Sequence, residues 1–257
     1  MYIFFLDSDD YIAKDTLGTL VRLVLAHNLD FLGFSSKNVS DSSQTEAAVP
    51  ARDVQMDEIR DGIAFIGTYN YKAEVWWYLL KRSFYDACGV RFYDKKFVQD
   101  SYLTPTLISK SKRAAFIPLD VHRYRQSKNS ITRKKSREHL LQHFDDLSFS
   151  VKQLYELRHG LIANGVTNQD ALRRLHVKQQ RYVLIVIVRF FKSPLESSLL
   201  REMLARFEGL EAYPMDKFMS ISDYRSSVFQ LLTFICNRKS LLFTSLRLYR
   251  AIFGRQQ

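Results

Sequence analysis

The chain has 257 residues, of which 46% are hydrophobic and 14% aromatic, a globular composition that excludes a disordered chain. Its two cysteines exclude a disulfide framework or a cysteine metal cluster and indicate a reducing compartment, and no apolar run is long enough to predict a transmembrane helix. The net charge of +11 predicts an anionic partner, with nucleic acid, a membrane surface and phosphorylated substrates all open.

The first predicted elements form a strand–helix–strand unit. Residues 2–6 are short, apolar and β-prone, and an apolar stripe at the helical period predicts a helix over about residues 14–28. Residues 30–35 form the second strand, and the polar stretch 36–53 predicts an exposed loop. A βαβ unit of this length predicts a parallel sheet.

The following elements alternate less regularly. Residues 56–66 and 72–87 are predicted as helices, and residues 98–109 as a helix despite Pro105. Residues 113–118 are predicted as a strand.

The predicted secondary structure changes near residue 133 from mixed strands and helices to helices alone, which predicts two domains, 1–132 and 133–257. The charged stretch 133–138 acts as a hinge, and everything after it is predicted to be helical. Residues 226–255 combine large apolar side chains with only positive charge. That pattern suits either a helix on an anionic membrane surface or a helical pair packed on the domain with a solvated basic face.

An acidic cluster, Asp7, Asp9 and Asp10, follows the first strand directly. Open α/β sheets bind ligands at the carboxyl ends of their strands, and clustered carboxylates repel one another unless a cation lies between them. Hard oxygen ligands suit Mg²⁺ or Mn²⁺, which typically bridge to substrate phosphates.

The acidic cluster has three other possible interpretations. An EF-hand loop starting at Asp7 requires glycine where Ile12 stands, so that interpretation fails. An aspartyl-phosphate phosphatase usually has threonine or valine where Tyr11 stands. Asp9 or Asp10 could instead simply cap the following helix.

Three blocks of the sequence resemble family 2 glycosyltransferases of the GT-A fold. They read FLDSDDYI at 5–12, VWWYLLKRSFYDACGVRF at 75–92 and FVQDSYLTPTLISKSKRAAFIPLDVHRYRQSKNSIT at 97–132. Their order and spacing match the family's D-x-D segment, its W-x-x-L segment and the stretch from an E-D pair to Y-R-x-x-x-x-S-I-T.

The resemblance implies an inverting glycosyltransferase, α/β in class, with a partial GT-A (Rossmann-like) sheet domain and an α-helical C-terminal region. It would move a sugar from a nucleotide-diphosphate sugar to a saccharide or lipid-linked acceptor hydroxyl, with Mn²⁺ or Mg²⁺, in bacterial surface polysaccharide or lipopolysaccharide synthesis. We therefore expect no nucleic-acid partner, and a place in the cytoplasm or on the inner face of the plasma membrane, with the anionic membrane surface as a further partner.

The resemblance assigns the carboxylates position by position. Asp9 is the expected metal ligand. Asp7 is expected near the donor's ribose or sugar and is the second choice as a metal ligand. Asp10 would support them. Asp100 matches the general base of the E-D pair, although Gln99 stands where the family usually has glutamate. The alternative for Asp100 is a helix N-cap.

Three further residues are candidates for substrate contacts. Trp76 matches the family's tryptophan and could stack on a sugar face, whereas the adjacent Trp77 fits a core position. Arg125 could pair with diphosphate oxygens. His122 could be a further metal or phosphate contact, or an ordinary surface histidine.

The family's sheet normally begins well before its D-x-D segment, which implies that this chain is an N-terminally truncated, C-terminal portion. The strand at 2–6 would then have an unpaired edge, and we expect the chain alone to bind nucleotide sugar weakly, with impaired activity. The alternative function, from another class, is a non-catalytic basic module that binds anionic membrane or nucleic acid.

Overall fold

A computed structural model describes residues 1–40, 43–93, 96, 98–125, 136–216 and 227–253. The chain divides into two compact units, which are considered separately. Unit 1 comprises Met1–Asp94 and Asp100–Arg133, and unit 2 comprises Lys95–Gln99 and Lys134–Gln257. The α/β class with a helical C-terminal region, predicted from the sequence, is confirmed.

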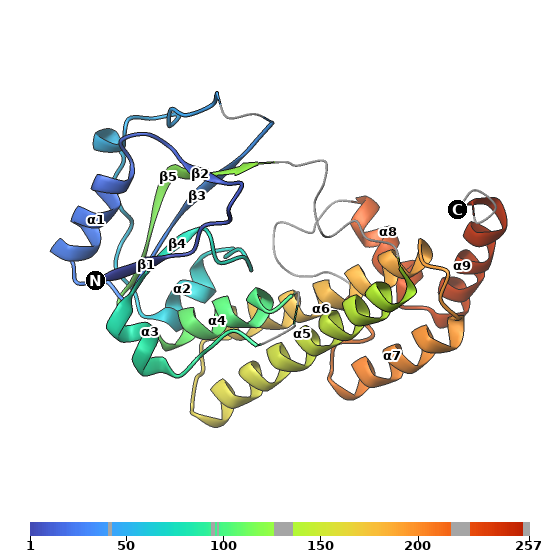
Figure 1. Ribbon diagram of the computed structural model, residues 1–257. Helices are drawn as coiled ribbons and strands as arrows, with labels where there is room; N and C mark the ends of the chain where they lie inside the picture. The colour runs from blue at the N-terminus through green and yellow to red at the C-terminus, as the bar shows by residue number, and fades with distance from the viewer. Residues whose placement is uncertain (41–42, 94–95, 97, 126–135, 217–226, 254–257) are drawn as a thin grey trace. The chain divides into compact units, whose positions relative to one another are not determined.

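Unit 1 is built on a five-stranded mixed sheet (Figure 1). The strands are β1 (Tyr2–Phe4), β2 (Tyr11–Ile12), β3 (Phe31–Val39), β4 (Tyr78–Lys81) and β5 (Ala114–Arg125), in the order β1-β4-β3-β5-β2. β3 and β5 pair in parallel, whereas the other neighbouring strands are antiparallel. β1 and β3 run in the same direction, as the predicted βαβ unit implies, but the sheet is mixed rather than parallel, because β4 lies between them and is antiparallel to both.

Alternating side chains of the sheet contact helices on opposite faces. Leu32 belongs to a buried cluster with Leu20 and Val24 of α1 (Leu17–Ala26). The ring of its neighbour Phe31 lies 5.3 Å from that of Phe65, which belongs to the helix α2 (Gly62–Thr68) on the other face. Unit 1 is therefore an α/β/α arrangement with the sheet in its middle layer.

The predicted helix over 72–87 is instead a strand followed by a short helix. β4 occupies the apolar run YLLK, and α3 (Arg82–Cys88) follows it directly. A short apolar run of this kind cannot be assigned to helix or strand from its periodicity alone. Pairing with β1 and β3 on both sides decides it.

Two other predicted boundaries change. The helix predicted over 56–66 begins only at Gly62, and the loop predicted over 36–53 begins only after β3 ends at Val39. The helix predicted over 98–109 is confirmed as α4 (Asp100–Lys110), with Pro105 inside it.

Unit 2 is helical in its described part. Its helices are α5 (Arg137–Ala163), α6 (Gln169–Phe191), α7 (Ser197–Gly209), α8 (Ser227–Cys236) and α9 (Lys239–Phe253). All five contribute to one buried cluster, which includes Leu147, Ile187, Leu204, Cys236 and Leu246. Across the described residues, none of the helices combines the length and the hydropathy needed to cross a membrane.

Candidate functional site

A buried chain of hydrogen bonds links three segments of unit 1 beyond the end of β1. Asp10 Oδ2 lies 2.9 Å from His122 Nε2, and His122 Nδ1 lies 2.9 Å from Ser36 Oγ. Asp10 Oδ1 accepts a 2.8 Å bond from the backbone N–H of Arg125. The side chains of Asp10 and His122 are 1% and 0% exposed, so water does not compete for these bonds.

The two side chains have the spacing of an ion pair, but His122 is neutral at pH 7. Burial, followed by the nearby Lys72 charge, lowers the pKa of His122 to about 4. Burial also raises the pKa of Asp10, although the Arg125 N–H bond opposes that change. Because a carboxylate only accepts, Nε2 carries the ring proton toward Asp10, and Ser36 Oγ donates to Nδ1.

Trp76 covers this chain of bonds with its ring. It stacks on His122 with the ring centroids 4.4 Å apart and an interplanar angle of 15°, and on Tyr124 at 5.7 Å. Lys72 Nζ lies 5.0 Å from the Trp76 ring centroid. The contact of Trp76 with a sugar, predicted from the sequence, would have to use the part of its ring that does not stack on His122 or Tyr124.

Trp77 occupies the core position expected for it. It is 2% exposed, and its Nε1 donates to the Lys72 carbonyl oxygen at 3.1 Å. Its ring lies so close to Gly33 that an added Cβ there would be 2.5 Å from Trp77 Cζ3.

Asp7 and Asp9 lie just beyond β1 with exposed side chains. Partial burial and the neighbouring charges of Asp10 and Asp9 raise the pKa of Asp7, while His122 opposes that rise. These exposed carboxylates are hard oxygen donors of the kind that Mg²⁺ and Mn²⁺ prefer. Within the described residues, no group of three His, Cys, Asp or Glu side chains is arranged to hold a metal ion. A bound ion would need its remaining ligands from substrate phosphates or water.

His122, proposed as a secondary metal ligand, has both ring nitrogens engaged in this structure. Ligation would require it to give up Ser36 or Asp10.

Asp100 is the first residue of α4, where a carboxylate interacts favourably with the helix dipole. Burial, followed by the negative charge of Glu74, raises the pKa of Asp100 to about 6. Asp7 adds a smaller rise, so the charge of the acidic cluster reaches Asp100. Backbone N–H groups of Asp100 and Ser101 bond to the carboxylate and oppose the rise. A carboxyl group with this pKa is well suited to general base chemistry near neutral pH.

Arg125 contacts the site with its backbone N–H, and not with its guanidinium. Its N–H holds Asp10, and its side chain is exposed at the end of β5. The S-I-T element predicted at 130–132 lies outside the described residues.

Two contributors were missed in the sequence. Ser36 was assigned to a loop, yet β3 continues through it in register with His122, which brings the two side chains together. Glu74 was not considered, although it is the largest charged influence on Asp100. Neither gave a local signal, because both act on residues far away in sequence.

Arg123 is a fully buried cation that sequence reasoning also missed. Its guanidinium donates to the carbonyl oxygens of Gln44 at 3.0 Å and Glu46 at 2.7 Å, and to Asp120 Oδ2 at 3.0 Å. Asp120 Oδ1 in turn accepts from the Ala48 N–H at 3.0 Å. Arg123 therefore fastens the 44–48 segment to β5.

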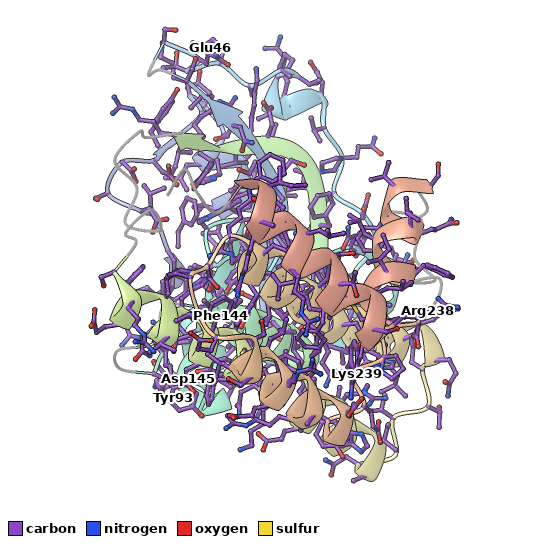
Figure 2. The ribbon with its side chains drawn as sticks, turned by 90° about the vertical axis from the view of Figure 1, so that its right-hand side faces the viewer. Glu46, Tyr93, Phe144, Asp145, Arg238 and Lys239 are labelled. Carbon is purple, nitrogen blue, oxygen red and sulfur yellow. The ribbon has the colours of Figure 1, made fainter. Side chains whose placement is uncertain are left out.

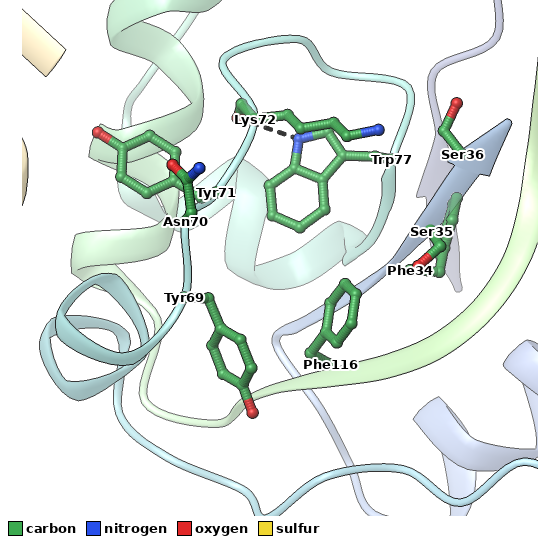
Figure 3. A pocket seen from close by; sticks show the side chains of 9 residues that line it. All are labelled: Phe34, Ser35, Ser36, Tyr69, Asn70, Tyr71, Lys72, Trp77 and Phe116. Carbon is green, nitrogen blue, oxygen red and sulfur yellow. Dashed lines mark hydrogen bonds between the residues drawn. The ribbon is translucent and has the colours of Figure 1, made fainter. Parts of the chain in front are cut away.

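A pocket of about 180 Å³ opens beside Ser36 (Figure 3). Its walls combine the aromatic rings of Tyr69, Trp77 and Phe116 with the polar ends of Ser36 and Lys72. Aromatic faces with a few polar groups are typical of small-ligand sites.

The sequence matches no protein-family model and no curated protein. Among solved structures, S. aureus TarS superimposes with a TM-score of 0.50 at 12% identity, over 95% of this chain and 40% of that chain. The chain has a glycosyltransferase fold. At this identity the likeness shows the fold alone.

Two structures of TarS 1–349 are less similar. The complex with UDP-GlcNAc gives a TM-score of 0.46 at 12% identity, over 82% of this chain and 65% of that chain. The complex with UDP gives 0.41 at 16%, over 82% and 64%. The chain thus spans less than two thirds of each TarS chain.

Proposed function

We propose that this chain takes part in glycosyl transfer from a nucleotide-diphosphate sugar to a hydroxyl acceptor. The observation that carries the proposal is the position of Asp100. Asp100 is a partly buried carboxyl group with a pKa of about 6, and it feels the charge of Asp7, a member of the acidic cluster that follows β1. The glycosyltransferase fold and the resemblance of the three sequence blocks support the same reaction.

Asp100 is the proposed general base. Its carboxylate accepts the proton of the acceptor hydroxyl, and the oxygen's electron pair forms the new bond to the anomeric carbon. The bond from that carbon to the diphosphate breaks on the opposite face, and its electron pair leaves with the nucleoside diphosphate. The configuration inverts. A base in this position contributes roughly 10²–10⁴-fold to such reactions.

Asp9, with Asp7 beside it, would hold Mn²⁺ or Mg²⁺. Such an ion supplies neutralisation of the charge that develops on the leaving diphosphate. Asp10 takes no part in this set, because both of its oxygens are engaged by His122 and Arg125. Its proposed task is to fix the position of the segment that carries Asp7 and Asp9.

A saccharide or lipid-linked acceptor, and a role in bacterial surface polysaccharide synthesis, remain part of this proposal by resemblance.

Metal binding is the direct test of the acidic cluster. Mn²⁺ added to the 257-residue chain is followed by electron paramagnetic resonance, with and without UDP as the diphosphate probe. We expect UDP to strengthen Mn²⁺ binding and Asp9→Asn to weaken it by at least about tenfold. Asp61→Asn, which changes an α2 cap elsewhere in unit 1, is the matched control. Equal Mn²⁺ binding by the wild type and Asp9→Asn would contradict the metal assignment.

Transfer itself tests Asp100. With any nucleotide sugar that is turned over, Asp100→Asn should lower kcat by roughly 10²–10⁴-fold and leave Mn²⁺ binding unchanged. Retention of full kcat in Asp100→Asn would exclude it as the base.

A further inference from the structure

The hairpin of α8 and α9 has two apolar sides, and the described residues of unit 2 cover only one of them. The inner side contributes Cys236, Leu242, Phe243 and Leu246 to the buried cluster. A surface helix in a globular protein normally has a polar face opposite its buried stripe. Here the opposite faces of both helices are apolar as well.

The exposed face of α8 follows the helical period. Val228, Leu231 and Leu232 are 70%, 60% and 41% exposed, and Ile235 lies one further turn along at partial exposure. These positions are spaced i, i+3, i+4 and i+7, so they form one stripe. The buried Thr233 and Cys236 point to a different side of the helix.

The exposed face of α9 is apolar mainly in its second half, because Thr244 and Ser245 lie between Leu241 and Leu248. Leu241, Leu248 and Ile252 are 40%, 59% and 65% exposed, at spacing i, i+7 and i+11. Scattered single apolar residues on a surface are ordinary, whereas several exposed apolar side chains gathered on two helices that contact each other indicate an interaction surface. We call the two exposed faces together the hairpin face.

The hairpin itself carries charged side chains of positive sign only. Residues 227–253 contain four Lys or Arg and no Asp or Glu. Arg238 and Lys239 lie at the turn between the helices (Figure 2), and Arg247 is exposed next to Leu248. The Arg238 guanidinium lies 3.6 Å from the centroid of the exposed Phe234 ring, so a cation borders an aromatic side chain there.

Not all of this charge is available to a partner. Arg250 donates to the carbonyl oxygens of Ser193 and Leu195 at 3.1 and 2.9 Å, just beyond the end of α6. Lys239 pairs with Glu208 at 2.7 Å. Among the described residues of the hairpin, Arg238 and Arg247 therefore remain to act on an external anionic surface.

We propose that the hairpin face docks onto the surface of a membrane that contains anionic lipid. Partial insertion of Leu, Ile and Val side chains with cations at their edge matches the interface of such a membrane. A second copy of the chain fits less well, because a two-fold contact would bring Arg238 and Arg247 of both copies together. Nucleic acid fits poorly as well, since its protein interfaces are polar rather than aliphatic.

Vesicle co-sedimentation of the 257-residue chain tests the proposal. We expect binding to vesicles of phosphatidylcholine mixed with phosphatidylglycerol, and much weaker binding to pure phosphatidylcholine. The double variant Leu248→Glu/Ile252→Glu should weaken binding by at least about tenfold. Ile162→Glu, on α5 and 46% exposed, is the matched control and should bind as the wild type does. Thermal melts establish that each variant is folded, as expected for exposed positions.

A variant that removes charge separates the electrostatic part of membrane binding from the part due to apolar side chains. Arg238→Gln/Arg247→Gln should reduce the preference for phosphatidylglycerol and leave the residual binding to phosphatidylcholine unchanged. Light scattering in the absence of lipid should show the same mass for the wild type and Leu248→Glu/Ile252→Glu. A wild-type dimer that this double variant dissociates, or wild-type binding indifferent to phosphatidylglycerol, would overturn the proposal.

Discussion

The Asp10 carboxylate and the His122 imidazole are joined at 2.9 Å although 112 positions separate them in the sequence. This contact ties the acidic segment after β1 to the end of β5, and Ser36 extends it to β3. The proposed metal ligands Asp7 and Asp9 therefore lie in a segment whose third carboxylate, Asp10, is buried and hydrogen-bonded to His122 and to the Arg125 N–H.

Removal of the His122 side chain should destabilise unit 1. His122→Ala leaves the buried Asp10 carboxylate without its Nε2 partner and removes the ring on which Trp76 stacks. We expect a loss of about 2–4 kcal/mol in the free energy of unfolding, measured by urea denaturation at pH 7. His27→Ala, at an exposed position, should change it by less than about 0.5 kcal/mol. Equal effects of the two substitutions would contradict the importance of the buried contact.

His122 should also make stability depend on pH. Its folded pKa of about 4 lies below its usual 6.5, so the unfolded chain takes up the proton first on acidification. Its contribution is therefore present above about pH 6.5 and is lost as the pH falls toward 4, by about 1–3 kcal/mol. Comparing urea denaturation of the wild type and His122→Asn across this range isolates the effect, since other groups titrate in both. Parallel curves for the two proteins would argue against a neutral, buried His122.

Asp100 should make the free energy of unfolding change with pH in the opposite direction. Its pKa is raised to about 6, so the folded chain holds this proton more tightly, and stability decreases as the pH rises through the interval from its usual 3.8 to 6. Asp100→Asn should accordingly stabilise the chain at pH 8 by about 1 kcal/mol and have little effect at pH 4. Carboxyl ¹³C NMR reports the pKa directly. Glu74→Gln and Asp7→Asn should each lower it, with Glu74→Gln having the larger effect.

Gly62 should tolerate no side chain. A Cβ at Gly62 would overlap the Ile108 carbonyl oxygen, where α2 approaches α4. Since that atom is backbone and cannot rotate away, Gly62→Ala should cost at least about 2–3 kcal/mol. Gly18→Ala is the control, because nothing lies within 4 Å of its added Cβ, and it should stabilise α1 by about 0.5–1 kcal/mol. Thermal midpoints that move in the same direction for both would refute the close approach.

Arg123 should control the order of the 44–48 segment. Arg123→Lys cannot reproduce the set of bonds to Gln44, Glu46 and Asp120, and we expect a loss of about 2–4 kcal/mol. Cleavage after Glu46 by a glutamate-specific protease should accelerate, and the Ala48 amide should exchange faster. Arg52→Lys, an exposed substitution, should leave both rates as in the wild type.

Local patterns in the sequence were sufficient for several features. Four features follow from side-chain spacing and composition: the α/β class, the acidic segment after a short strand, a helix close to the predicted range 98–109, and the apolar, basic character of residues 226–255. Such signals lie within a few residues of one another, so no knowledge of the fold is needed to detect them.

Other features depended on which strands pair. Pairing decided that YLLK is a strand, and the parallel register of β3 with β5 placed Ser36 opposite His122. It also buried Arg123 among carbonyl oxygens of a segment 77 to 79 positions away. The exposure of the second apolar face of α8 and α9 likewise emerged only once the helices had packed. The sequence by itself determined which chemical groups this protein carries and in what local order. The tertiary structure decided which of these groups meet, because contacts between strands and helices distant in the chain produce no periodic pattern in the sequence.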